Sequence, residues 1–177
     1  MKIIFDYREK DLIEKSERIL KKYNFENIEI ITENLNIGDV IIKDDNKELL
    51  IIERKTLRDL SCSIKDGRYK EQSMRLNAHD IHNHNVIYLI EGITSGFGYI
   101  EDPRVNIKTL YSCMCALLCH KGFSVFRSLS IHESAEIIVR FADKINRENN
   151  CDFFYNLSND NENIISKPQE LYSSTIK

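Results

Sequence analysis

Three consecutive charged residues, Glu53, Arg54 and Lys55, directly follow the apolar run 48–52, which is typical of a buried strand. A buried strand does not normally end in three charges unless they serve a site. Glu53 and Lys55 are two residues apart, so on a strand they point to one face and Arg54 points to the other. One face would therefore carry a carboxylate and an ammonium group side by side.

A second carboxylate lies just before this strand. Asp39 follows Gly38 and opens the apolar segment 40–42, which can pair with 48–52 as a hairpin through the polar turn 44–47. Asp39 and Glu53 would then share one Mg2+, a hard ion that takes carboxylate, water and phosphate oxygens as ligands. A metal-bound water becomes a nucleophile near neutral pH, and Lys55 would orient it or hold the phosphate. These residues predict phosphodiester hydrolysis with Mg2+, for which Mn2+ can substitute.

Arg54 has a planar guanidinium group that suits either a phosphate or a carboxylate. On the opposite face of the strand, its structural role would be to pair with a nearby acid, and Asp59 is the candidate. Both roles remain open from the sequence.

The pattern Gly38-Asp39, Glu53-Arg54-Lys55 and Asp59 resembles the signature of the XPF family of structure-specific DNA endonucleases. Further likeness lies in the opening Asp6-Tyr7-Arg8-Glu9 and in segments 60–72, 86–91, 122–123 and 133–135, so that it covers roughly residues 1–147. The stretch 60–72 is most similar to the crossover-junction endonuclease branch, which processes flaps, forks and nicked junctions.

The resemblance implies a role for each matching residue. Catalytic residues fall on Asp39, Glu53 and Lys55, with Arg54 and Asp59 in support, and Asp6 and Glu9 join Asp39 and Glu53 as candidate metal ligands. The family fold is the restriction-endonuclease-like α/β core, a mixed central sheet flanked by helices. Family members also dimerise through late helices, here 108–120 and 131–145, as homo- or heterodimers.

The periodicity of the chain agrees with an α/β domain, because strand and helix patterns alternate along it. Apolar spacing and breaking glycines predict strands at 2–6, 40–42, 48–55, 86–91 and 123–127, and helices at 10–23, 57–64, 68–79, 108–120 and 131–145.

The charge distribution bears on DNA binding. The formal net charge is -3, whereas a basic face usually supplies the affinity for nucleic acid. Between residues 54 and 75, however, there are seven Lys or Arg residues and three acidic residues. This is a local excess of four positive charges beside the predicted metal site. We expect this segment to contact the DNA backbone through Arg58, Lys65, Arg68, Lys70, Gln72 and Arg75.

Composition fits one intracellular domain. With 177 residues and 42% hydrophobic content, the chain can form a core without disulfides. It has no apolar stretch of membrane-spanning length, and its start is too charged for a signal peptide. We expect a soluble protein, nuclear in a eukaryote or at the cytoplasmic site of viral DNA replication in a virus. Cys113, Cys115 and Cys119 share one helical pattern without separated ligand pairs, so we expect buried free thiols rather than a zinc site.

The segment 148–177 differs from the rest of the chain. It turns to Asn, Asp, Glu and Ser, and 148–170 holds five acids and one lysine, which predicts an acidic, flexible tail or linker. The helix-hairpin-helix repeats that follow the nuclease domain in most XPF-family members are not found here. This leaves room for two alternatives to a branched-DNA endonuclease: a metal-dependent phosphodiesterase for small or cyclic nucleotides, and a non-catalytic DNA-binding or dimerisation subunit.

Overall fold

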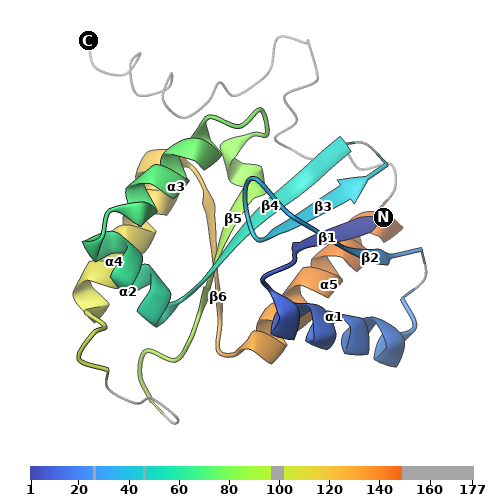
Figure 1. Ribbon diagram of the computed structural model, residues 1–177, viewed down its shortest axis with the longest axis horizontal. Helices are drawn as coiled ribbons and strands as arrows, with labels where there is room; N and C mark the ends of the chain where they lie inside the picture. Colours follow the sequence, from blue (N-terminus) through green and yellow to red (C-terminus); the bar gives the residue numbers. More distant parts are fainter. Residues whose placement is uncertain (26, 46, 97–101, 149–177) are drawn as a thin grey trace.

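The computed structural model describes residues 1–25, 27–45, 47–96 and 102–148, which form a six-stranded sheet between two layers of helices (Figure 1). The predicted tail at 149–177 lies outside the described residues. In chain order the elements are β1 (Lys2–Asp6), α1 (Lys10–Tyr23), β2 (Glu29–Glu33), β3 (Val40–Asp44), β4 (Lys47–Thr56), α2 (Leu57–Lys65), α3 (Arg68–Asn77), η1 (Asn83–Asn85), β5 (Val86–Glu91), α4 (Ile107–Cys115), η2 (Ala116–His120), β6 (Ser124–Ser128) and α5 (Ile131–Arg147).

The sheet is mixed, with the strand order β2-β1-β3-β4-β5-β6. β3 pairs antiparallel with both β1 and β4, which confirms the predicted hairpin, whereas the β1–β2, β4–β5 and β5–β6 pairs are parallel. β4 and β5 each have a strand on both sides, and both are buried along most of their length because helices cover both faces of the sheet. Their carboxyl ends meet at one edge of the sheet.

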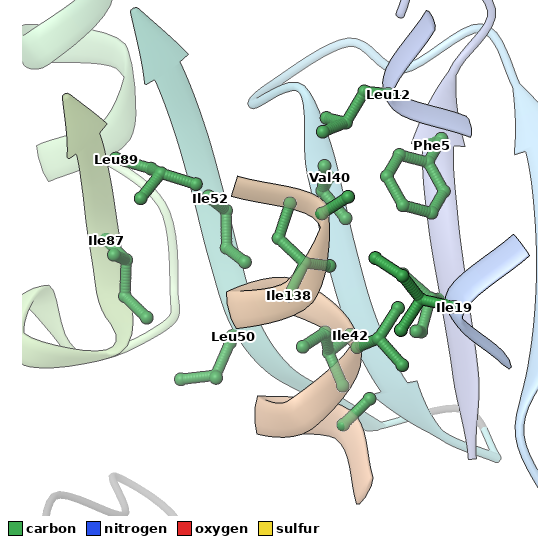
Figure 2. Close-up of a cluster of buried hydrophobic side chains, with 14 residues drawn as sticks. Phe5, Leu12, Ile19, Val40, Ile42, Leu50, Ile52, Ile87, Leu89 and Ile138 are labelled. Atoms are coloured by element: carbon green, nitrogen blue, oxygen red, sulfur yellow. The ribbon is translucent and has the colours of Figure 1, made fainter. Parts of the chain in front are cut away.

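Each face of the sheet packs against its own set of helices. On one face, α1 and α5 contribute Leu12, Ile19 and Ile138 to a core with Phe5 and the even-numbered residues of β3 and β4 (Figure 2). On the other face, α2, α3 and α4 cover the odd-numbered residues (Figure 1). Successive residues of β4 thus point into different layers, as the period of a strand requires.

The sequence predicted most elements to within a few residues, with one strand missing. β2 was not predicted, because its five residues are half-buried or exposed at the edge of the sheet and lack a clear alternating pattern. The predicted helix 108–120 is divided between α4 and the π-helical turn η2.

The expectation of buried thiols is right for Cys113 and wrong for Cys115 and Cys119, which are exposed. The helix packs onto the sheet through Leu110, Cys113 and Leu117, and Cys115 and Cys119 lie on its exposed side. Within the described part of the chain, no helix combines the length and apolarity needed to span a bilayer.

Candidate active site

Two carboxylates meet where β3 begins and β4 ends. Ile52 pairs with Val40, and its carbonyl oxygen accepts a 2.9 Å hydrogen bond from the backbone N–H of Asp39. This register places Asp39 beside Glu53, on the face that the sequence predicted. Gly38 turns the chain into β3 with a φ of 70°, and a Cβ there would stand 2.6 Å from Cγ2 of Ile51. Only glycine therefore lets the chain approach β4 this closely.

The electrostatics of this pair favour a bound cation. Burial and the negative charge of Glu53 raise the pKa of Asp39 to about 7. The backbone N–H of Arg54 donates to the Asp39 carboxylate at 2.8 Å, which acts in the opposite direction and lowers the pKa. Glu53 is 5% exposed. Two adjacent carboxylates in such surroundings repel each other unless a proton or a cation lies between them. The donor set is the oxygen-rich one that Mg2+ takes.

Lys55 lies on the same face as Glu53, as its spacing predicted. Its Nζ is 2.8 Å from Oε1 of Glu53, and both side chains are buried. The ammonium group is therefore fixed at the carboxylate pair rather than free in solvent. It balances part of their negative charge.

Arg54 points to the opposite face and is held by two acids. Its Nε and Nη2 donate to the two carboxylate oxygens of Glu91, at 2.8 and 2.9 Å, and its Nη1 donates to Glu9 at 2.9 Å. Ser134 at the start of α5 donates to Glu91 at 2.8 Å. The expected pairing with Asp59 is wrong. Glu91 takes that place because β5 runs parallel to β4 and brings Glu91 opposite Thr56.

Asp6 and Glu9 have different environments. Asp6 is fully buried, and it accepts hydrogen bonds from the backbone and Nε of Arg8 and from the backbone N–H of Leu35. The hydrogen bond from Arg8 holds the pKa of Asp6 below its ordinary value. Glu9 lines the cleft at the carboxylate pair, whereas Asp6 is not among the lining residues. Asp6 thus secures the loop that leads to Gly38, and its predicted role as a metal ligand is not supported by its position.

Asp59 lies in the first turn of α2, whose N-cap residue is Thr56. Its backbone N–H donates to Oγ1 of Thr56, and its carboxylate accepts from the same hydroxyl at 2.5 Å. This reciprocal arrangement satisfies the free end of the helix. Asp59 also lines the cleft, so the structure brings it to the site.

The six residues predicted to bind DNA divide into two groups. Arg68, Gln72 and Arg75 of α3 line the cleft, whereas Arg58, Lys65 and Lys70 do not. Arg58 lines a separate pocket beside Asp102 at the end of β4, and Lys65 points to the carbonyl of Arg104 at 3.4 Å. Arg75 donates to the backbone carbonyl of Asn36, which ties α3 to the loop before Asp39.

Sequence reasoning missed Arg8 and Glu91. Arg8 lines the cleft together with Arg68 and Arg75, and its side chain is 63% exposed. It belongs to the quoted segment Asp6-Tyr7-Arg8-Glu9, which was the available signal. Glu91 ends a strand that was predicted correctly, but its partner lies 37 residues earlier in the chain.

The cleft has a volume of about 300 Å3 and joins the loop before β3, the end of β4 and the helices α2 and α3. Its charged lining residues are Arg8, Glu9, Asp39, Glu53, Arg54, Lys55, Asp59, Arg68 and Arg75. Among the described residues, no group of three or more His, Cys, Asp or Glu side chains is arranged to hold a metal ion. A cation here would take its other ligands from water and substrate, which is usual for Mg2+.

Comparisons with known proteins identify relatives of this arrangement. Residues 5–141 match the model of the ERCC4 domain family. A probable crossover junction endonuclease mus81 of Dictyostelium discoideum is 45% identical over 101 residues, which are 54% of this chain and 11% of that protein. The crossover junction endonuclease MUS81 of Arabidopsis thaliana is 31% identical over 142 residues, which are 75% of this chain and 20% of the length of that protein.

A viral protein and a solved structure extend the comparison. The ERCC4 domain-containing protein EP364R of African swine fever virus (isolate Warthog/Namibia/Wart80/1980) is 24% identical over 152 residues, 85% of this chain and 39% of the relative. XPF from Aeropyrum pernix superposes with a TM-score of 0.63 at 25% identity, covering 84% of this chain and 66% of that one. These likenesses confirm the predicted fold class, and the chain spans less than half the length of each of these curated relatives.

Proposed function

Because this chain belongs to the ERCC4 domain family, we propose that it is a metal-dependent endonuclease that hydrolyses phosphodiesters in branched DNA. The substrates would be 3′ flaps, forks and nicked junctions that arise in DNA repair or recombination. The observation that carries the proposal is the convergence of Asp39, Glu53 and Lys55 in one cleft with arginines on its walls. Relatives named crossover junction endonucleases support the substrate class.

Asp39 and Glu53 would hold Mg2+, or Mn2+ in its place, with Glu9 close enough to raise the pKa of Asp39. A cation so bound would offset charge on the reacting phosphoryl group and lower the pKa of the attacking water. The contact with Glu53 fixes the ammonium group of Lys55 beside the carboxylates. From this position it would contact an oxygen of the reacting phosphate. Arg54 uses three of its five N–H groups to bind Glu9 and Glu91, so it would position Glu9.

The flanks of the cleft would hold the DNA backbone. Arg8 comes from the chain after β1, and Arg68 and Arg75 come from α3. Their charges would attract phosphates to a chain whose net charge is negative. Gln72 lies between them on the same helix.

We also propose that the protein acts as a dimer through the late helices. This region exposes four large apolar side chains. Tyr111 lies on α4, Leu118 on η2, Phe126 on β6 and Leu129 just before α5. A MUS81 relative of Rattus norvegicus, 36% identical over 85 residues, is named a structure-specific endonuclease subunit. Relatives from a eukaryote and a virus support an intracellular setting, either a nucleus or a site of viral DNA replication.

The test is Mg2+-dependent cleavage of an end-labelled 3′ flap, a splayed fork, a nicked junction and plain duplex. The wild type should cut branched substrates preferentially, and Asp39→Asn and Lys55→Ala should each reduce the rate at least about 100-fold. Lys21→Ala, an exposed lysine in the last turn of α1, is the matched control and should cut normally.

Three results would overturn the proposal. Cleavage that survives in Asp39→Asn or Lys55→Ala would place the active site elsewhere. Failure of the folded wild type to cut any DNA, with hydrolysis of cyclic or short nucleotides instead, would favour the phosphodiesterase alternative. No cleavage of either kind, with DNA binding retained, would favour a non-catalytic subunit.

A further inference from the structure

Two exposed thiols lie side by side at a site remote from the chemistry described above. Cys115 ends α4, Cys119 lies in the π-helical turn η2, and their sulfur atoms are 3.8 Å apart. Neither residue lines the carboxylate cleft. The other described cysteines differ, since Cys113 is buried and Cys62 is partly buried.

The separation of the two sulfur atoms matches a metal site. A tetrahedral zinc ion with Zn–S bonds of about 2.3 Å separates adjacent thiolates by about 3.8 Å. A disulfide would need an S–S distance of about 2.05 Å, far shorter than the 3.8 Å observed. The pair is thus spaced to bind an ion between its sulfur atoms without a large movement of either side chain.

The local backbone provides a second, independent argument. Cys115 and Cys119 are four residues apart, so they lie on one face of the helix. The turn between them is π-helical, a rare conformation that often occurs at functional sites. Because the inner face of this segment packs through Leu117, both thiols are directed outward, where water can complete the coordination of an ion.

We propose that Cys115 and Cys119 form a two-thiolate site for a soft metal ion such as Zn2+ or Cd2+. Soft thiolates select such ions, whereas the carboxylates of the cleft select hard ones, so the two sites would not compete. The thiolate rather than the thiol binds the ion, so metal binding displaces protons and the affinity should rise with pH.

The experiment is titration of the reduced full chain with Cd2+, followed by the ultraviolet absorbance of the cadmium–thiolate bond. We expect one Cd2+ ion to bind with high affinity to each Cys115–Cys119 pair. The increase in ultraviolet absorbance should correspond to two cadmium–thiolate bonds. Loss of an outer-shell partner alone weakens metal binding by about 10–100-fold, so Cys115→Ser or Cys119→Ser should weaken it at least tenfold. Cys62→Ser and Cys151→Ser keep the pair and should titrate like the wild type.

Circular dichroism of each variant separates loss of the site from loss of the fold, and replacing two exposed side chains should leave the spectrum unchanged. A cadmium–thiolate signal of full size in Cys115→Ser/Cys119→Ser would overturn the proposal, as would a wild type without such a signal. Neither result depends on nuclease activity.

Discussion

At the scale of single residues, the carboxyl group of Asp39 makes stability depend on pH. Its pKa is about 7 in the folded chain, because burial and the charge of Glu53 disfavour the ionised form. In the unfolded chain the pKa of an aspartate is about 3.9. At a pH between about 3.9 and 7, Asp39 is therefore protonated in the folded state and ionised in the unfolded state. The free energy of unfolding should therefore fall as pH rises from about 4 to 7, by on the order of 2 kcal/mol.

Asp39→Asn should remove this loss and raise the free energy of unfolding at pH 8. Urea unfolding of both proteins at pH 5 and pH 8, with a chelator present, measures the difference. Asp80→Asn, a change at an exposed acid, is the control and should follow the wild type. Equal pH slopes for wild type and Asp39→Asn would show that Asp39 ionises normally.

The same residues show how far the sequence predicts the site. Strand alternation was enough to separate Glu53 and Lys55 from Arg54, because a period of two depends only on local backbone geometry. The partner of Arg54 was not predictable in this way. Glu91 reaches it through the parallel pairing of β4 with β5, and that pairing is set by packing across the whole sheet.

At the scale of elements, Glu91 joins β4 to β5 and α5. Replacing it with alanine leaves Arg54 buried without its bidentate partner, and breaking such a pair costs about 3–5 kcal/mol. Ser134→Ala removes one hydrogen bond to Glu91 and one with Ser128, and should cost about 1–2 kcal/mol. Denaturant unfolding of both variants measures the two free energies, and a cost for Glu91→Ala no larger than that for Ser134→Ala would contradict this account.

Gly38 and Gly67 allow a matched comparison of strain. Both have positive φ, 70° and 82°, but a Cβ at Gly38 would stand 2.6 Å from Ile51 and one at Gly67 would meet no atom within 4 Å. Gly67→Ala should therefore cost about 1–2 kcal/mol, from the backbone alone.

Gly38→Ala adds the clash and should cost about 1–3 kcal/mol more. It should also slow cleavage, because Asp39 would move away from Glu53. Thermal unfolding and cleavage rates of the two variants test this, and similar losses for both would mean that the space beside Ile51 is not limiting.

Elements with a strong apolar pattern were predicted well, and those shaped by neighbours were not. β5 and α1 have the predicted bounds, because burial on both faces of β5 and on one face of α1 leaves a clear sequence period. β2 is held by backbone pairing with β1 and shows little of its own pattern. The π turn at η2 likewise has no sequence signal, since the same residues are compatible with a regular helix.

At the scale of the whole molecule, a net charge of -3 coexists with a cleft whose flanks carry Arg8, Arg68 and Arg75. Binding to DNA should therefore weaken steeply with salt, since each contacted phosphate releases about one counterion. Arg8→Ala and Arg68→Ala should each lower the slope of log K against log salt by about one. Fluorescence anisotropy with a labelled fork measures these slopes. Lys22→Ala, in the last turn of α1, should leave the slope unchanged, and equal slopes in all proteins would exclude the cleft as the phosphate site.

The alternation of β4 between two layers has a consequence for how this gene tolerates insertions and deletions. One codon added between Ile52 and Glu53 would turn Glu53 and Lys55 toward α1 and α5 and turn Arg54 toward α2, α3 and α4, although every amino acid is kept. Two added codons would restore each side chain to its own layer. Insertion scanning of β4 should thus reveal an odd–even rule for survival of the fold, which substitution scanning cannot detect.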